Sequence, residues 1–189
     1  MTAAGPLRLV VVGTSGAGKS HFARAVAQRL GCAHIELDAL FWGPNWTPRP
    51  TEVFVAAAAN AAAGENWVID GNYSIARDAV WPRATHMVWL DFNRATVLWR
   101  VLRRTVRRVA LRETLWSGNR ESVRQAFASR ASILLWSAGT FDKIRRRHRQ
   151  FQAEGQPPQA RWVVLRNPAE AAAWLQQLPA VRPSPTSDR

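Results

Sequence analysis

The sequence predicts an α/β fold with a five-stranded, mostly parallel sheet and helices on both faces. Five short apolar runs rich in β-branched residues alternate with segments that have the apolar spacing of helices. The first run is followed directly by a glycine-rich loop and then by a helical pattern. Such alternation is typical of a parallel sheet whose crossover helices cover both faces.

The predicted strands are apolar runs that end at glycine or polar residues. The first run is closed by Gly13 and is continuously apolar after Arg8, as is typical of a strand buried on both faces. We therefore expect this strand to be central. The five runs are LRLVVVG (7–13), AHIEL (33–37), NWVIDG (66–71), HMVWLDF (86–92) and ARWVVL (160–165).

Helical patterns follow the first strand and fill the long stretch between the fourth and fifth. Residues 21–30, HFARAVAQRL, have one apolar face and end before Gly31. From Asn93 onward, apolar residues share one face of a predicted helix, and most of the arginines occupy the other. A second long helix is predicted from about Arg120 to Gln150.

Positive charge is concentrated in one segment of the chain. The protein has 26 Lys and Arg residues against 13 Asp and Glu residues, which gives a formal charge of +13. Residues 94–149 hold fifteen of the basic and three of the acidic residues, or +12, so the rest of the chain carries +1. Such a segment indicates nucleic acid, an anionic membrane surface or phosphate-bearing small molecules as partners.

Length and composition favour one cytoplasmic domain. A chain of 189 residues, 47% of them hydrophobic, can build one core, so we expect a single domain over 1–181 and a disordered tail over 182–189. Cys32 is the only cysteine, which excludes an internal disulfide and fits a reducing compartment. No apolar run approaches the roughly 20 residues of a membrane span, so we expect no membrane segment.

The loop GTSGAGKS matches the phosphate-binding pattern G-x-x-x-x-G-K-[ST]. Its glycines let the backbone curl around phosphate oxygens, and the following helix adds the positive end of its dipole. Lys19 would bridge the β- and γ-phosphates of ATP, and the Ser20 hydroxyl would ligate Mg²⁺. The predicted nucleotide contacts are Gly13, Thr14, Ser15, Gly16, Ala17, Gly18, Lys19, Ser20 and His21.

A carboxylate should support the metal, and three aspartates stand at or near the ends of predicted strands. Asp70 is favoured because it closes an apolar strand and precedes a glycine that lets a ligand come close. Asp38 is the second candidate. Asp91 precedes the arginine-rich helix, which either Asp91 or Asn93 is expected to cap.

Taken in order, these motifs resemble the P-loop nucleoside-monophosphate-kinase-like family, and within it the adenylate-kinase-related subgroup often called topology modulation proteins. The resemblance extends from about Leu7 to Leu178. It implies a three-layer P-loop NTPase fold with a helical, arginine-rich lid. The motifs are GTSGAGKS, IELDALFWGPNW, WVIDGNY, LDFNRATVLWRVLRR, RETLWSGNRES and VVLRNPAEAAAWL.

The resemblance also implies roles for individual residues. Residues 38–66 would receive the phosphate acceptor, and 94–150 would form the lid and its helices. Packing is the alternative role for the aromatic side chains, and helix capping for Asn167, which would otherwise lie against the donor base. The predicted acceptor-binding residues are Asp38, Trp42, Trp46, Asp70, Gly71, Tyr73 and Arg77. Lid arginines Arg108, Arg112 and Arg120 are predicted ligand contacts, and Lys19, Asp70, Arg112 and Arg120 are the predicted catalytic residues.

The acceptor region departs from that of adenylate kinases. Those enzymes have an arginine three residues after the aspartate that matches Asp38, and this chain has Phe41 there. Their DGFPR motif is replaced by DGNYSIAR, which moves the candidate acceptor-binding arginine to Arg77. The sequence therefore does not identify AMP as the acceptor.

Three functions are consistent with these patterns. The leading one is an ATP- and Mg²⁺-dependent phosphotransferase that acts on a nucleotide or a similar small acceptor. The second is a nucleic-acid-associated NTPase, or topology modulator, whose arginine-rich segment binds DNA, although no helix-turn-helix, zinc or RNA-recognition signature accompanies it. The third is a regulator that binds ATP without turnover.

Overall fold

All five strands form one parallel sheet, in the order β2-β3-β1-β4-β5. The computed structural model describes residues 5–111 and 139–180, and for residues 104–111 it describes the backbone alone. The strands are β1 (Arg8–Gly13), β2 (Ala33–Glu36), β3 (Trp67–Asp70), β4 (His86–Leu90) and β5 (Arg161–Leu165). The prediction of five strands with the first in the centre is confirmed.

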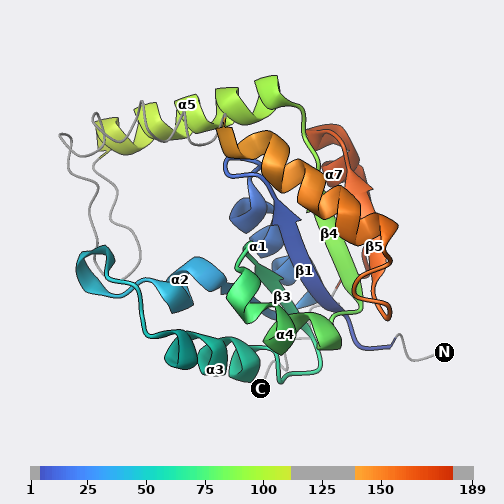
Figure 1. The fold of residues 1–189 in the computed structure, drawn as a ribbon. Coiled ribbons are helices and arrows are strands. Elements are labelled where there is room, and N and C mark those ends of the chain that lie inside the picture. The colour runs from blue at the N-terminus through green and yellow to red at the C-terminus, as the bar shows by residue number, and fades with distance from the viewer. Residues whose placement is uncertain (1–4, 112–138, 181–189) are drawn as a thin grey trace, which may run out of the picture.

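Helices cover both faces of this sheet and give a three-layer α/β P-loop fold (Figure 1). One face packs against α1, α5 and α7, and the other against α2, α3 and α4. The helix of residues 139–153 contributes Phe141 to the first cluster and packs His148 against Trp89 in the second. The helices with assigned bounds are α1 (Lys19–Leu30), α2 (Leu37–Phe41), α3 (Thr51–Ala61), α4 (Arg77–Val80), α5 (Arg94–Leu111) and α7 (Pro168–Gln177).

Strand β1 separates the two halves of the core. Its side chains alternate, so that Leu9 and Val11 join the cluster that contains α1, while Val10 and Val12 join the cluster that contains α3. All four side chains are at most 2% exposed. A strand buried in this way needs apolar residues on both faces, which explains its continuous apolar sequence.

The strand order places the expected ligand site of an open parallel sheet at the carboxyl end of β1. The chain reaches β3 on one side of β1 and β4 on the other, and ligands of open parallel sheets bind where neighbouring connections diverge in this way. At this end, Leu90 of β4 pairs with Gly13 of β1, and Asp70 of β3 pairs with Val11, two residues earlier in β1. Helix α5 lies across this end of the sheet (Figure 1).

A partly buried ion pair connects the helix of residues 139–153 to the end of β4. Arg145 donates from Nε and Nη2 to the two oxygens of Asp91, at 2.6 and 2.9 Å. Asp91 is 8% exposed, and its carboxylate raises the pKa of Arg145. Of the two predicted caps of α5, Asn93 has this role, because its Oδ1 accepts the N–H of Thr96 at 2.8 Å.

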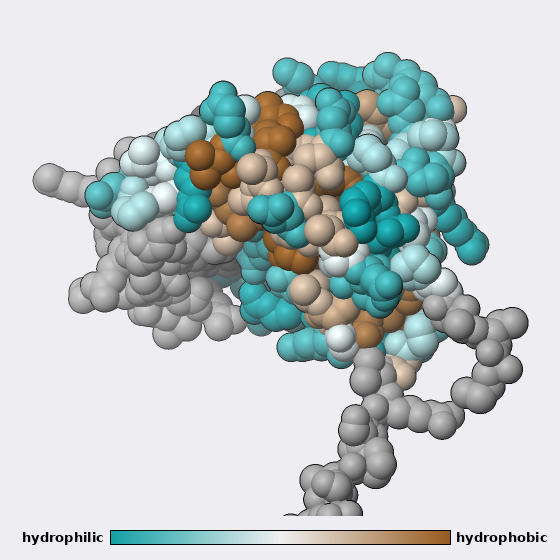
Figure 2. Space-filling model, turned by 90° about the horizontal axis from the view of Figure 1, so that it is seen from below, coloured by the Kyte–Doolittle hydropathy of each residue, from teal (hydrophilic) through white to brown (hydrophobic). Residues whose placement is uncertain are grey.

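Figure 2 shows the molecule from below, the side on which α3 lies in Figure 1. Hydrophobic residues gather among hydrophilic ones on this face, and Val53 of α3 is half exposed. Among the helices of residues 5–111 and 139–180, none combines the length and the apolar composition of a membrane span.

We expect Arg145→Leu to lower the free energy of unfolding by about 2–3 kcal/mol, because it leaves the Asp91 carboxylate buried without its partner. Arg146→Leu is the matched control, since Arg146 lies next to Arg145 but is exposed. Urea unfolding at pH 7 measures both variants. Equal stability of the two would contradict the role of the Asp91–Arg145 pair.

Candidate functional site

The glycine-rich loop curls at its glycines, all three of which have positive φ. Gly16 has φ +86° and Gly18 has φ +90°, a region that residues with a Cβ rarely occupy. A Cβ on Gly16 would also overlap the Val101 side chain, and one on Gly18 would stand 2.9 Å from Nη1 of Arg100. The loop therefore fits under α5 only with glycine at position 16, and at position 18 the positive φ favours glycine.

Helix α1 starts at the end of this loop, as the sequence predicts. Gly18 is its N-cap, and no described side chain caps this end of the helix. The helix dipole and the first N–H groups are thus oriented toward the loop, as in phosphate-binding sites. Lys19 Nζ donates to the carbonyl of Thr14 at 3.2 Å, which holds the ammonium over the loop.

Ser20 and Asp70 are brought together from positions 50 residues apart. The Ser20 hydroxyl donates to Asp70 Oδ1 at 2.9 Å, and Asp70 is 4% exposed at the end of β3. The other oxygen, Oδ2, lies 2.7 Å from Nε2 of His34 on β2. Asp70 is thus a buried carboxylate held by two side chains, and sequence reasoning did not single out His34.

Asp38 has a different environment. Its Oδ1 accepts the hydroxyl of Tyr73 at 2.6 Å, and burial together with Asp38 raises the pKa of Tyr73. Among the described residues, Asp70 and not Asp38 contacts Ser20. Of the two predicted metal-supporting carboxylates, the geometry favours Asp70.

The segment after β3 packs closely against β1. Gly71 has φ +142°, and a Cβ there would stand 2.8 Å from Cβ of Leu37. The next residue, Asn72, donates from Nδ2 to the Gly13 carbonyl at 2.6 Å and accepts the Gly13 N–H at 3.4 Å. Asn72 was missed by sequence reasoning, although it follows directly on the Asp-Gly pair that was recognised.

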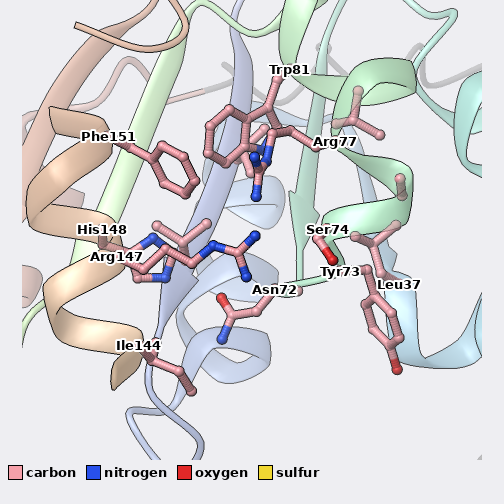
Figure 3. Close-up of a pocket in the computed structure, with 15 residues that line it drawn as sticks. Leu37, Asn72, Tyr73, Ser74, Arg77, Trp81, Ile144, Arg147, His148 and Phe151 are labelled. Atoms are coloured by element: carbon pink, nitrogen blue, oxygen red, sulfur yellow. The ribbon is translucent and has the colours of Figure 1, made fainter. Parts of the chain in front are cut away.

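A positively charged pocket opens beside this segment, between α4 and the helix of residues 139–153 (Figure 3). The guanidinium groups of Arg77 and Arg147 both point into the space between the two helices. None of the described residues that line the pocket is acidic. Its cavity volume is about 60 Å³, which has room for about two water molecules.

The Arg77 guanidinium lies between two aromatic rings. It is 4.8 Å from the centre of the Trp81 ring and 4.3 Å from that of Phe151. Burial and the neighbouring charge of Arg147 lower its pKa. A stacked guanidinium keeps its N–H groups free at the edge of the plane, which suits it to binding an anion.

His148 forms the inner wall of the pocket. It is 5% exposed and packs 5.8 Å from the ring of Trp89. Its Nδ1 is buried without a hydrogen-bond partner in the described part of the chain. Burial, with the charges of Lys19, Arg147 and Arg77, lowers the pKa of His148 to about 4. The imidazole is therefore neutral near pH 7.

A second pocket lies on the other side of the loop, between α1, α5 and α7. It has a cavity volume of about 210 Å³ and a largely apolar lining that includes His21, Phe92 and Pro168. Arg100 borders it, donates to the carbonyl of Ala17 at 2.7 Å and stacks 4.9 Å from the centre of the Phe92 ring. Arg100 of α5 therefore faces the phosphate loop rather than solvent.

Other predicted contacts have structural partners. The rings of Trp42 and Trp46 pack edge to face at 5.8 Å, and Trp42 packs in the same way on Phe41. Asn167 caps α7, because its Oδ1 accepts the N–H of Glu170 at 2.9 Å. These are the packing and capping alternatives that the sequence left open. Three predicted lid contacts, the Arg108 side chain, Arg112 and Arg120, lie outside the described residues.

The solved structures that are similar to this chain include two kinases. One is a gluconokinase from Sinorhizobium meliloti 1021, with 21% identity, coverage of 90% of this chain and 92% of that chain, and a TM-score of 0.49. The other is a shikimate kinase from Bacteroides thetaiotaomicron, with 16% identity, coverage of 90% and 94%, and a TM-score of 0.45. No protein-family model and no curated protein sequence matches the chain.

The lowered pKa of His148 predicts a pH-dependent stability. Because the unfolded chain binds a proton near pH 6.5 and the folded protein only near pH 4, the free energy of unfolding should fall as the pH drops through this window. The loss should reach about 3 kcal/mol at most. Urea unfolding of the wild type and His148→Phe at pH 7 and 4.5 measures it. The free energy of unfolding of His148→Phe should fall less than that of the wild type between these two pH values. An equal fall in both proteins would contradict the lowered pKa of His148.

Proposed function

We propose that the protein is an ATP- and Mg²⁺-dependent kinase that transfers the γ-phosphoryl group to a small acceptor carrying an anionic group. One observation carries the proposal: the phosphate loop, with the Ser20–Asp70 pair, adjoins the pocket of Arg77 and Arg147 through Asn72, which lines the pocket and bonds to the backbone of Gly13. A donor and an acceptor bound at these places would meet above the end of β1.

The loop residues suit the donor phosphates. The curled backbone, the start of α1 and the ammonium of Lys19 together supply positive charge where the β- and γ-phosphates would lie. The apolar pocket beside Arg100 and Pro168 adjoins the loop and has space for part of the base or sugar of ATP.

The residues present also suit Mg²⁺. The hydroxyl of Ser20 is an oxygen ligand of the kind that hard cations prefer, and the carboxylate of Asp70 beside it can accept a hydrogen bond from a water of the ion. The described residues contain no group of three or more His, Cys, Asp or Glu side chains that could hold a metal by themselves. Mg²⁺ is commonly held by one or two protein groups, water and substrate phosphates, so this pair is sufficient. When bound, the ion would neutralise charge that develops on the transferring phosphoryl group.

The acceptor site is defined by charge. Arg77 and Arg147 present two guanidinium groups to a pocket without acidic lining residues, and a phosphate or carboxylate group can bind both in bidentate fashion. Tyr73 and Asn72 line the same pocket on the side of β3. A nucleotide remains one acceptor of this class, and Arg112 and Arg120 remain predicted contacts for the transferring group.

If the protein binds nucleic acid, the arginines of α5 need a different orientation. Binding along a duplex requires arginines on an exposed face, and Arg103 is exposed whereas Arg100 is directed toward the loop. A kinase is recognised by release of ADP that depends on an added acceptor. A DNA-associated NTPase is instead stimulated by DNA, and a regulator binds ATP without turnover.

We expect Lys19→Ala to reduce acceptor-dependent ADP release by at least about 10²-fold, because it removes the charge between the β- and γ-phosphates. Lys143→Ala is the matched control, since Lys143 is the only other lysine and lies exposed on the helix of residues 139–153. The assay screens nucleotides, sugar acids and sugar phosphates as acceptors. Near-normal turnover by Lys19→Ala, with the thermal stability of the wild type, would end the kinase proposal.

Arg147→Gln should raise KM for the acceptor by about 10-fold or more and leave KM for ATP within about twofold, because only the acceptor's anionic group would contact this side chain. Arg149→Gln, an exposed change on the same helix, is the control. Steady-state kinetics with the best acceptor of the screen measures both constants. If the KM for ATP rises instead, the pocket has been assigned to the wrong substrate.

A further inference from the structure

Both oxygens of Asp70 are engaged by side chains from different elements. Oδ1 accepts the hydroxyl of Ser20 on α1, and Oδ2 lies 2.7 Å from Nε2 of His34 on β2. The His34 side chain is 12% exposed and that of Asp70 is 5% exposed. An ionised carboxylate only accepts hydrogen bonds, so Nε2 of His34 carries the proton of this contact.

We propose that His34 is a positioning residue that sets the orientation of the Asp70 carboxylate toward the Mg²⁺ of the bound nucleotide. The inference rests on the proposed function, because it concerns the metal that would accompany ATP. His34 fixes Oδ2, so that Oδ1 alone remains directed at Ser20 and at a water of the metal.

The sheet explains how His34 reaches this carboxylate. In the parallel register of β2 and β3, His34 pairs with Val68 and Glu36 pairs with Asp70. His34 and Glu36 point to the same face because side chains alternate along a strand. The imidazole is long enough to extend along this face to Oδ2, one pleat further on.

Helix α1 covers the same face and makes two contacts one helical turn apart. Ser20 binds Asp70, and Arg24 binds Glu36 at 3.0 Å. Arg24 is exposed, so its ion pair contributes little to stability. The contacts of Asp70 with Ser20 and His34 therefore fix the start of α1 and strand β2 relative to the end of β3, beside the proposed metal site.

A carboxylate without the His34 contact has more freedom to turn about its Cβ–Cγ bond. It can then turn Oδ1 away from Ser20 and from the water of the metal, although Mg²⁺ requires its water ligands in near-ideal octahedral positions. Partners that orient ligands in this way typically change metal affinity by about 10- to 100-fold when they are removed.

The test measures nucleotide binding rather than turnover. Isothermal titration calorimetry gives the affinity for a non-hydrolysable ATP analogue across a series of Mg²⁺ concentrations. His34→Leu removes the donor, His34→Asn retains an amide that is too short to reach Oδ2, and His34→Gln restores a donor at about the original distance. Arg24→Gln is the control, because it breaks the neighbouring contact of α1 with β2 without touching Asp70.

In the Leu and Asn variants, the Mg²⁺ concentration at which the affinity for the analogue is half-maximally increased should be higher than in the wild type by about 10-fold or more. The Gln and Arg24→Gln variants should stay within about threefold of the wild type. If His34→Leu does not fold, the Asn and Gln variants decide the question.

If analogue binding by the folded Leu or Asn variant depends on Mg²⁺ as it does in the wild type, the proposed role of His34 is wrong. The kinase proposal is not affected by that result. A wild-type protein whose nucleotide binding does not depend on Mg²⁺ would contradict the proposed function itself, and with it the inference.

Discussion

The hydrogen bond between Ser20 and Asp70 is the constraint on which the geometry of the site depends. It joins the first turn of α1 to the end of β3, and both partners are polar groups in a largely buried place. A buried carboxylate is costly unless it is hydrogen-bonded, so Asp70 is stable here only because Ser20 and His34 both contact it. The position of the phosphate loop relative to the sheet follows from this contact.

The arginines near the phosphate loop have two different surroundings. Arg145 is neutralised by Asp91 and serves to fasten its helix to the sheet. Arg147, two residues further on, points into the pocket with Arg77, and no acidic residue lines that pocket among those described. The ion pair of Arg145 therefore holds in place the helix that presents Arg147 and His148 to the pocket.

Local patterns predicted the sheet, the central strand and the phosphate loop because each depends on neighbouring residues. The long-range contacts were less accessible. Asp70 could be ranked above Asp38 from its glycine neighbour, but the His34 contact depends on strand register, which spacing along the chain does not reveal. Arg147 and His148 lie in a run of basic residues, RRRHR, where only the orientation of the helix distinguishes Arg145, which binds Asp91, from Arg147, which faces the pocket.

The position of the metal relative to Ser20 tests the central claim most directly. A crystal structure with Mn²⁺ and a non-hydrolysable ATP analogue locates the ion by its anomalous scattering. The account predicts an ion bound to the Ser20 hydroxyl and to the β- and γ-phosphates, with Asp70 hydrogen-bonded to one of its waters. An ion held away from Ser20 and Asp70, or an analogue whose phosphates lie outside the loop of Gly13–Ser20, would contradict it.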